Sequence, residues 1–288
     1  SEIMSTELQY LEMLLLILCL QWLTKEEAPR VLGKLISIHS ASTLAILATL
    51  YLIVILFEPT YTWIYTVAGL LTVIIGIFCR FHFPQFSETV EQRKELVFRK
   101  RYWLYYALTF LAGARRQIFM VFAGFLLVQK FGFPLEKMVL LFLVNAGITV
   151  WIAPKLGLLV ERIGERKALT LEYLGLIIIF LSYAVVESMN IALVLYILDN
   201  VFFSISFAIS TYFQKIADPA DIASTAGISF TINHIAAVLL PALLGLIWIE
   251  NHGAVFLIGA SIAGASLILV RAIPDTPEIG KETYWTNN

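Results

Sequence analysis

Charged residues are scarce in this sequence of 288 residues. Asp, Glu, Lys and Arg make up 14% of the chain, against roughly 25% in an average soluble domain. Hydrophobic residues reach 59%, and the mean hydropathy is +0.84. This composition excludes an ordinary soluble domain and is typical of a membrane protein. The net charge of −1 is uninformative about partners, because the positions of Lys and Arg matter more than their sum, and nothing points to a nucleic acid.

Cysteines and reactive-site motifs are scarce as well. Cys19 and Cys79 both lie in apolar runs, which is typical of small core residues rather than of a disulfide or a metal pair. The sequence has no Gly-rich phosphate loop ending in Lys and Ser or Thr, no metal-spaced cluster of His, Glu or Cys, and no nucleophile elbow. These absences argue against an ATP-driven pump and against an enzyme, and no cofactor or metal is expected.

Long apolar runs dominate the chain instead. Crossing roughly 30 Å of hydrocarbon as a helix takes about 20 apolar residues. Strand-like alternation is absent, so a closed barrel is excluded. We therefore predict an all-α polytopic membrane protein with about nine transmembrane helices. The predicted spans lie near 7–23, 35–57, 61–81, 102–128, 135–154, 168–187, 190–213, 223–248 and 253–272.

Basic residues alternate between the loops. The loops after the first, third and fifth predicted spans hold most of the Lys and Arg, whereas the opposite loops hold only Lys130 and Lys137. By the positive-inside rule, the C-terminal end is cytoplasmic and the N-terminal end lies outside. An odd number of spans with an external start indicates that earlier spans are missing. The predicted location is the cell membrane, and we expect the inner membrane of a bacterium.

An internal repeat indicates two halves. Segment 20–29 resembles segment 211–219, because each leads from an aromatic helix end through a short charged loop to a proline. The two copies lie roughly 190 residues apart, the length of six helices with their connections. From this spacing we predict four regions. They are the last three helices of an N-terminal half in 1–81, a cytoplasmic linker in 82–101, a complete six-helix C-terminal half in 102–273 and a disordered cytoplasmic tail in 274–288.

The loop after the fifth predicted span carries the most specific motif. Its residues are Gly157, Glu161, Arg162, Gly164, Arg166 and Lys167. The motif resembles the signature loop of the major facilitator superfamily, which is Gly, three residues, Asp-Arg, one residue, Gly and then basic residues. Glu161 replaces the usual Asp, and Glu165 stands where a basic residue often does. A loop that is basic only to set the topology is the alternative.

This resemblance implies a helical bundle like that of the superfamily, with a complete C-terminal six-helix half and a partial N-terminal half. It also implies alternating access around a midplane site, to which the fourth, fifth, seventh and eighth spans contribute. The chemistry of the loop agrees with a gate on the cytoplasmic side. Gly157 and Gly164 permit close helix approach and tight turns, and Glu161 can lie against the positive end of a neighbouring helix.

Two consecutive arginines lie inside the fourth predicted span. Arg115 and Arg116 are roughly 20 Å from its inner start at a rise of 1.5 Å per residue. An arginine in mid-membrane costs at least about 2.5 kcal/mol when it faces lipid. Because neighbouring side chains point about 100° apart, we expect one arginine to bind solute and the other to brace helices. A purely structural clamp is the alternative.

Other polar side chains reach a similar depth. Asp199 is the expected carboxylate partner of an arginine. His234 is the strongest span candidate for titration near neutral pH, although a hydrogen-bonded packing role is the alternative. Glu172 is expected near the inner interface, where it would snorkel or pair with a loop. The remaining candidates for binding or coupling are Asn145, Asn200, Asn233 and His39.

The sequence therefore predicts a secondary active transporter that moves a small anionic or polar organic solute by alternating access, with a proton as the candidate coupling ion. The expected partners are the solute, the lipid bilayer and the missing N-terminal helices, supplied in cis or in trans. The alternative is a non-transporting membrane scaffold or sensor derived from the same fold, or an incomplete transporter fragment.

Overall fold

The computed structural model describes residues 15–57, 60–82 and 98–285. This part of the chain is helical, and its extended pairing is limited to an isolated bridge between Glu278 and Lys281. Within the described residues, eight helical stretches are long and apolar enough to cross a membrane. The predicted all-α polytopic membrane fold is thus confirmed. Residues 7–14 of the first predicted span lie outside the described residues, while 15–22 are helical.

The helices follow the predicted apolar runs closely, because a run of this length satisfies its backbone hydrogen bonds internally only as a helix. In chain order the α-helices are α2 (Ala28–Phe57), α3 (Tyr61–His82), α4 (Trp103–Gln117), α5 (Leu135–Ile163), α6 (Glu165–Val185), α7 (Met189–Phe203), α8 (Ala208–Ile216), α9 (Ile222–Glu250) and α10 (His252–Val270). Short 3-10 turns at Lys100–Tyr102 and Pro219–Asp221 lead into α4 and α9, and π-helical segments at Ile118–Ala123 and Leu126–Lys130 extend α4.

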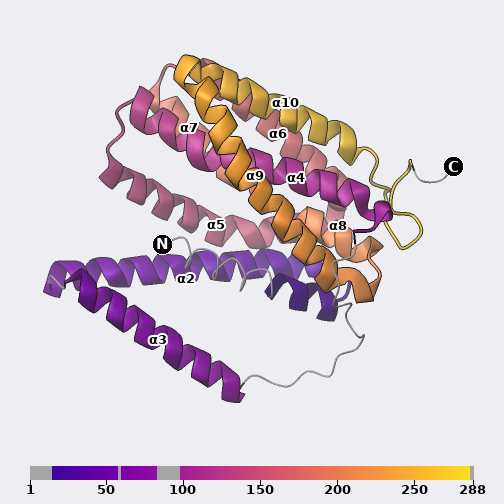
Figure 1. Ribbon diagram of the computed structural model, residues 1–288, viewed down its shortest axis with the longest axis horizontal. Coiled ribbons are helices and arrows are strands. Elements are labelled where there is room, and N and C mark those ends of the chain that lie inside the picture. Colours follow the sequence, from indigo (N-terminus) through magenta and orange to yellow (C-terminus); the bar gives the residue numbers. More distant parts are fainter. Residues whose placement is uncertain (1–14, 58–59, 83–97, 286–288) are drawn as a thin grey trace.

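The helices from α4 to α10 form one bundle, shown in magenta to yellow in Figure 1. In this bundle α10 packs along α6, and α4 packs between α9 and α10. Two apolar clusters fill the interior. One gathers around Tyr102, Tyr173 and Phe213 near the end where α4 begins and α10 ends, which we call the tail end. The other gathers around Phe122 and Phe180 toward the opposite end.

Helix α2 lies alongside α5, and glycines allow the two backbones to approach closely (Figure 1). A Cβ added to Gly33 would lie 2.6 Å from the carbonyl oxygen of Ala153, and one added to Gly157 would lie 2.7 Å from that of Pro29. The backbones could not pack this closely around larger residues. Gly157 therefore fulfils the predicted role in close helix approach.

Helix α3 behaves differently from the other spans. It diverges from α2 and stands apart from the bundle in Figure 1. None of its hydrophobic stretch is buried by the described part of the chain. Gly69 and Gly76 have open space where a Cβ would stand. An apolar helix of this kind presents its whole surface to lipid or to further helices.

The seventh predicted span, 190–213, is broken rather than continuous. Helix α7 ends at Phe203, and α8 begins at Ala208. In the turn between them the amide of Ser206 donates to the carbonyl of Phe203 at 3.0 Å, which is the tighter 3-10 pattern. The Ser204 hydroxyl also donates to the carbonyl of Asn200 at 2.7 Å. The backbone hydrogen bonds thus tighten to the 3-10 pattern between α7 and α8, a change that the hydropathy does not show.

The prediction of a disordered tail is wrong for residues 274–285. The Tyr284 amide donates to the carbonyl of Ala272 at 2.9 Å, and the Tyr212 hydroxyl donates to the carbonyl of Glu282 at 2.6 Å. Trp285 stacks on Trp103 with ring centroids 5.9 Å apart. These aromatic contacts offset the entropy of ordering the segment, which its polar composition had concealed. The predicted linker, apart from its ends, lies outside the described residues.

Candidate functional site

Arg115 lies in the interior of the bundle and is 1% exposed. One guanidinium nitrogen donates to the Ser266 hydroxyl on α10 at 2.5 Å, and another pairs with the Glu172 carboxylate on α6 at 3.2 Å. Its guanidinium carbon lies 4.4 Å from the centroid of the Tyr173 ring. Hydrogen bonds, an ion pair and a cation–π contact thus hold three helices together through one side chain. In this structure Arg115 is the bracing arginine.

Glu172 was expected to snorkel or to pair with a loop, and this expectation is wrong. The residue is fully buried, two turns into α6, with its carboxylate against Arg115. A carboxylate at this depth cannot snorkel, and a paired cation is what makes its burial tolerable. The sequence contains a signal for this contact, because Glu172 stands in an apolar run, but sequence spacing cannot show which helix faces it.

Asp199 does not make the expected direct contact with an arginine, because Arg115 pairs with Glu172 instead. It is 1% exposed, and neither of its carboxylate oxygens has a hydrogen-bond partner. Its charge interacts with those of Arg115 and Glu172. Helices α4, α6 and α7 therefore bring one arginine and two carboxylates together in the bundle interior. We call Arg115, Glu172 and Asp199 the buried charge cluster.

Arg116 points away from the buried charge cluster and is exposed. One turn before it, Gly113 meets α9 so closely that an added Cβ would lie 2.7 Å from the side-chain oxygen of Asn233. Asn233 is itself exposed, and the neighbouring His234 is half-buried, with Nδ1 2.9 Å from the carbonyl of Phe230. The contact between α4 and α9 thus presents a set of polar groups at one level of the bundle.

Asn145 and Asn200 belong to a second polar contact, between α5 and α7. The Asn200 amide donates to the Thr149 hydroxyl at 3.1 Å, and that hydroxyl donates to the Asn145 carbonyl at 2.8 Å. The side-chain oxygen of Asn145 is buried without a partner. His39 stays apart from both sets, exposed on α2. The structure therefore divides the predicted site residues into three groups rather than one.

The loop between α5 and α6 has the predicted tight turn. Gly164 adopts φ of +81°, a conformation in which a side chain would be strained. Glu165, which departs from the signature, is buried and pairs with Lys215 at 2.7 Å. Arg166 pairs with Asp275 of the tail at 3.1 Å. The other charged residues of the motif, Glu161, Arg162 and Lys167, are exposed.

The family model described as Major Facilitator Superfamily matches residues 13–241. The chain belongs to this superfamily. It is thus a multi-pass membrane protein of a transporter family, as the motif around Gly157 had indicated. No curated protein matches the chain at a significant level.

This superfamily member also carries contacts at its tail end that sequence reasoning missed. The Gln214 side-chain amide donates to the carbonyls of Leu20 at 2.8 Å and Leu23 at 2.9 Å. The Lys25 ammonium donates to the carbonyl of Lys215 at 2.9 Å. These bonds join the two copies of the internal repeat, 20–29 and 211–219. The repeat was visible in the sequence, but the contact between its copies was not.

A second missed contact surrounds Asp221, at the start of α9. This buried carboxylate pairs with Arg99 and Arg101 and accepts a hydrogen bond from the Tyr102 hydroxyl at 3.1 Å. The hydrogen bond with Asp221 raises the pKa of Arg99, so this guanidinium stays charged at any ordinary pH. Arg99 and Arg101, which the sequence analysis used only to orient the chain, thus anchor the entry to α4.

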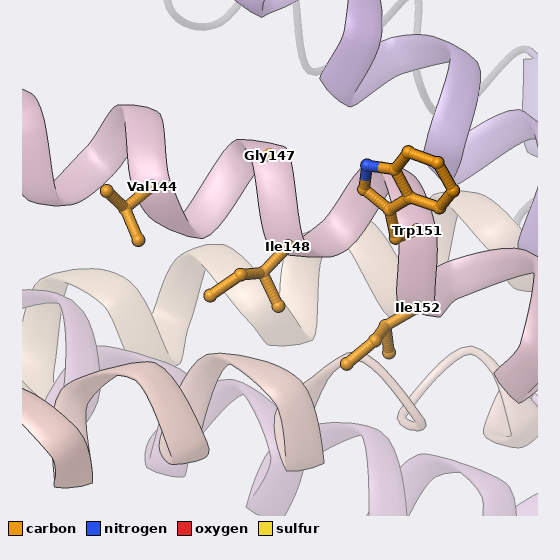
Figure 2. A pocket seen from close by; sticks show the side chains of 5 residues that line it. All are labelled: Val144, Gly147, Ile148, Trp151 and Ile152. Carbon is orange, nitrogen blue, oxygen red and sulfur yellow. The ribbon is translucent and has the colours of Figure 1, made fainter.

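A shallow groove runs along one face of α5, and Figure 2 shows that its lining side chains all come from this helix. The lining residues are Val144, Gly147, Ile148, Trp151 and Ile152. None of them carries a charge, and none belongs to the predicted site. An open apolar groove of this kind suits a lipid chain or a neighbouring helix rather than a polar solute.

Proposed function

We propose that this chain forms part of a secondary transporter that moves a small anionic or polar organic solute by alternating access. The observation that carries the proposal is the difference in surroundings between two adjacent arginines. Arg115 is buried and binds Ser266 and Glu172 inside the bundle, whereas Arg116 is exposed in the same span. A guanidinium at roughly 20 Å from the inner start of a membrane helix needs an anion, water or protein partner.

Polar groups on the neighbouring helix α9 support the same proposal. Asn233 and His234 on α9 lie near the level of Gly113, one turn before the arginine. A guanidinium supplies charge-assisted hydrogen bonds to an anion, and the amide and imidazole supply adaptable polar contacts. Asn145 and Asn200 would complete the solute surface from α5 and α7. Arg115 would act on the site by positioning α4 rather than by touching solute.

The arrangement of the two halves supports alternating access. In the proposal, helix 15–22 with α2 and α3 belongs to the N-terminal half, and α4 to α10 form the C-terminal half, with the tail end in the cytoplasm. Helices α2 and α5 pack across the boundary through Gly33 and Gly157. Glycine contacts let two rigid halves rock against each other with little side-chain rearrangement. The exposed His39 lies on the N-terminal side of this boundary.

The proposed N-terminal half is completed by further helices, in cis or in trans. Helix α3 supports this, since its apolar surface is not buried by any described residue. The lipid bilayer alone can also cover an apolar helix. A bundle half that forms one wall of a polar cavity, however, must shield that cavity from lipid, and α2 and α3 diverge too far to do so (Figure 1).

The experiment that tests the solute site is uptake into proteoliposomes by the complete protein, with the purified protein screened by thermal shift for its solute. The screening panel holds small organic anions, neutral polar solutes and organic cations. Arg116→Ala is expected to abolish uptake while the protein remains folded. Lys137→Ala, which removes an equally exposed charge at the far end of the bundle, serves as the matched control. Normal uptake by both Arg115→Ala and Arg116→Ala would refute the site.

A non-transporting scaffold or sensor is the second candidate, and one observation favours it. Arg115 and Glu172 are paired with each other and buried, as expected for a charge pair that holds a fold together. The two candidates differ in a flux measurement. A sensor would show a solute-dependent thermal shift without net movement of that solute across the membrane.

Proton coupling is part of the proposed transporter, with Asp199 and His234 as its candidates. His234 lies against the Phe230 carbonyl, a contact that an ordinary packing histidine also makes. Asp199 has no hydrogen-bond partner for its carboxylate. Asp199 is therefore the better candidate.

A further inference from the structure

The buried charge cluster is unbalanced. It contains one guanidinium, on Arg115, and two carboxylates, on Glu172 and Asp199, and all three side chains are at most 1% exposed. The charged or titratable groups that interact with Asp199 are Arg115 from α4, Glu172 and Tyr183 from α6, and Tyr196 from its own helix. The next residue on α7, Asn200, bonds the Thr149 hydroxyl of α5, and both of these groups are neutral. Among these groups, no second cation compensates the second carboxylate.

An uncompensated carboxylate in a membrane-embedded interior is strongly disfavoured, since its charge is neither solvated nor paired. We propose that the buried charge cluster is a proton-binding site that holds one proton on the carboxyl group of Asp199. A proton from water forms an O–H bond with one carboxylate oxygen, and the charge of the cluster falls from minus one to zero. No other bond changes.

The geometry assigns the proton to Asp199 rather than to Glu172. One oxygen of Glu172 accepts a hydrogen bond from Arg115 at 3.2 Å, so its ionised form is stabilised. Both oxygens of Asp199 are buried without a partner. A proton also fits this site better than a metal ion does. Hard metal cations require a shell of several oxygen ligands, and the described residues contain no acid or histidine cluster that could hold a metal.

The position of Asp199 gives the proton a route to a conformational effect. Asp199 lies about one turn before the end of α7 at Phe203, where the span breaks. Beyond the break, α8 carries Gln214 and Lys215, which bond the segment 20–25. Gain or loss of charge on Asp199 changes its attraction to Arg115 and thus the position of α7 at the break. This link to transport rests on the proposed function, but the proton site itself does not.

Infrared spectroscopy of the purified complete protein tests the site without any transport assay, because a protonated carboxyl group has a carbonyl stretching band that a carboxylate lacks. The charge balance predicts the number of such buried groups in each variant. Wild type should show one band, sensitive to hydrogen–deuterium exchange, and Asp199→Asn should show none. Glu172→Gln should also show none, because Asp199 then balances Arg115. Arg115→Gln should show two, since both carboxyls are then neutral.

Two isosteric variants keep the test independent of folding. Asp199→Asn and Glu172→Gln preserve the shape of the cluster, so their loss of the band cannot be ascribed to a collapsed core if thermal unfolding remains cooperative. Glu161→Gln, which removes an exposed acid near the C-terminal end of α5, is the control and should keep the wild-type band. Absence of the band in wild type, or its persistence in Glu172→Gln, would overturn the proposal.

Adding sodium chloride distinguishes a bound proton from a bound sodium ion. If wild type lacks the band and is stabilised by sodium but not by choline at equal ionic strength, the cluster binds a cation and the proton assignment is wrong. Uptake measured in parallel separates this proposal from the transporter function. If the wild-type band responds as predicted but solute uptake is absent, the proton site is supported. Only the proposed transport function would then be wrong.

Discussion

Lys25 and Lys215 occupy equivalent positions in two sequence copies 190 residues apart, and they meet in the structure. The Lys25 ammonium donates to the Lys215 carbonyl at 2.9 Å, while the Lys215 ammonium pairs with Glu165 at 2.7 Å. Equivalent positions of a two-fold repeat approach each other only near the pseudo-symmetry axis. In the proposed arrangement of two halves, the axis would pass through the tail end, where a gate would close.

Breaking this contact should loosen the tail end. Gln214→Ala removes hydrogen bonds to Leu20 and Leu23, each worth about 0.5–1.5 kcal/mol, so the open population should rise roughly 5- to 140-fold. Cys19, next to the contact and partly buried, reports the opening as faster thiol labelling in a Cys79→Ser background. Gln129→Ala, which removes the acceptor of the Trp248 indole instead, should leave labelling unchanged. Equal labelling rates in both variants would exclude a gate at this contact.

The two arginines should differ in their effect on stability. Arg115→Ala leaves the buried Glu172 without its partner and should lower the free energy of unfolding by about 3–5 kcal/mol. Arg116→Ala should stay within about 0.5 kcal/mol of wild type, because that side chain is exposed. Chemical unfolding followed by circular dichroism measures both. Similar losses in the two variants would contradict the distinction between a bracing and an available arginine.

The glycine contact between α2 and α5 should be intolerant of even one methyl group. Gly157→Ala forces the added carbon against the Pro29 carbonyl and should cost about 1–3 kcal/mol. Gly147→Ala on the same helix is the matched control, because nothing lies within 4 Å of its added carbon. Thermal unfolding in one detergent compares them. A loss in both variants of the same size would point to helix propensity rather than to the contact.

The further helices proposed to pack against α3 can be detected directly by crosslinking. A photo-crosslinking amino acid at Val73, an exposed position of α3, should capture another polypeptide segment in membranes of cells that make the complete protein. The same probe at Leu257, exposed on α10, should capture lipid. Mass spectrometry of the adducts identifies the segment and shows whether it belongs to the same chain. Lipid adducts at Val73 alone would mean that the bilayer covers α3.

Much of the architecture follows from local properties of the sequence. The apolar runs predicted the membrane helices because a backbone in hydrocarbon must satisfy its own hydrogen bonds. The spacing of Gly157 and Gly164 predicted the superfamily and the tight turn. The argument that adjacent residues point about 100° apart led us to expect different surroundings for Arg115 and Arg116, which the structure shows. Each of these inferences depends on residues that are close together in the chain.

Only the tertiary structure decided which distant groups meet. Depth along the spans suggested Asp199 as the arginine's partner and left Glu172 near the interface. The packing of α6 and α4 against α10 instead places Glu172 beside Arg115. The tertiary structure likewise decided that the tail folds back, with Trp285 stacked on Trp103. It also decided that the repeat copies meet through Gln214. Burial and pairing depend on which helix faces rotate toward each other. That rotation is set by side-chain packing across the whole bundle, which no single segment encodes.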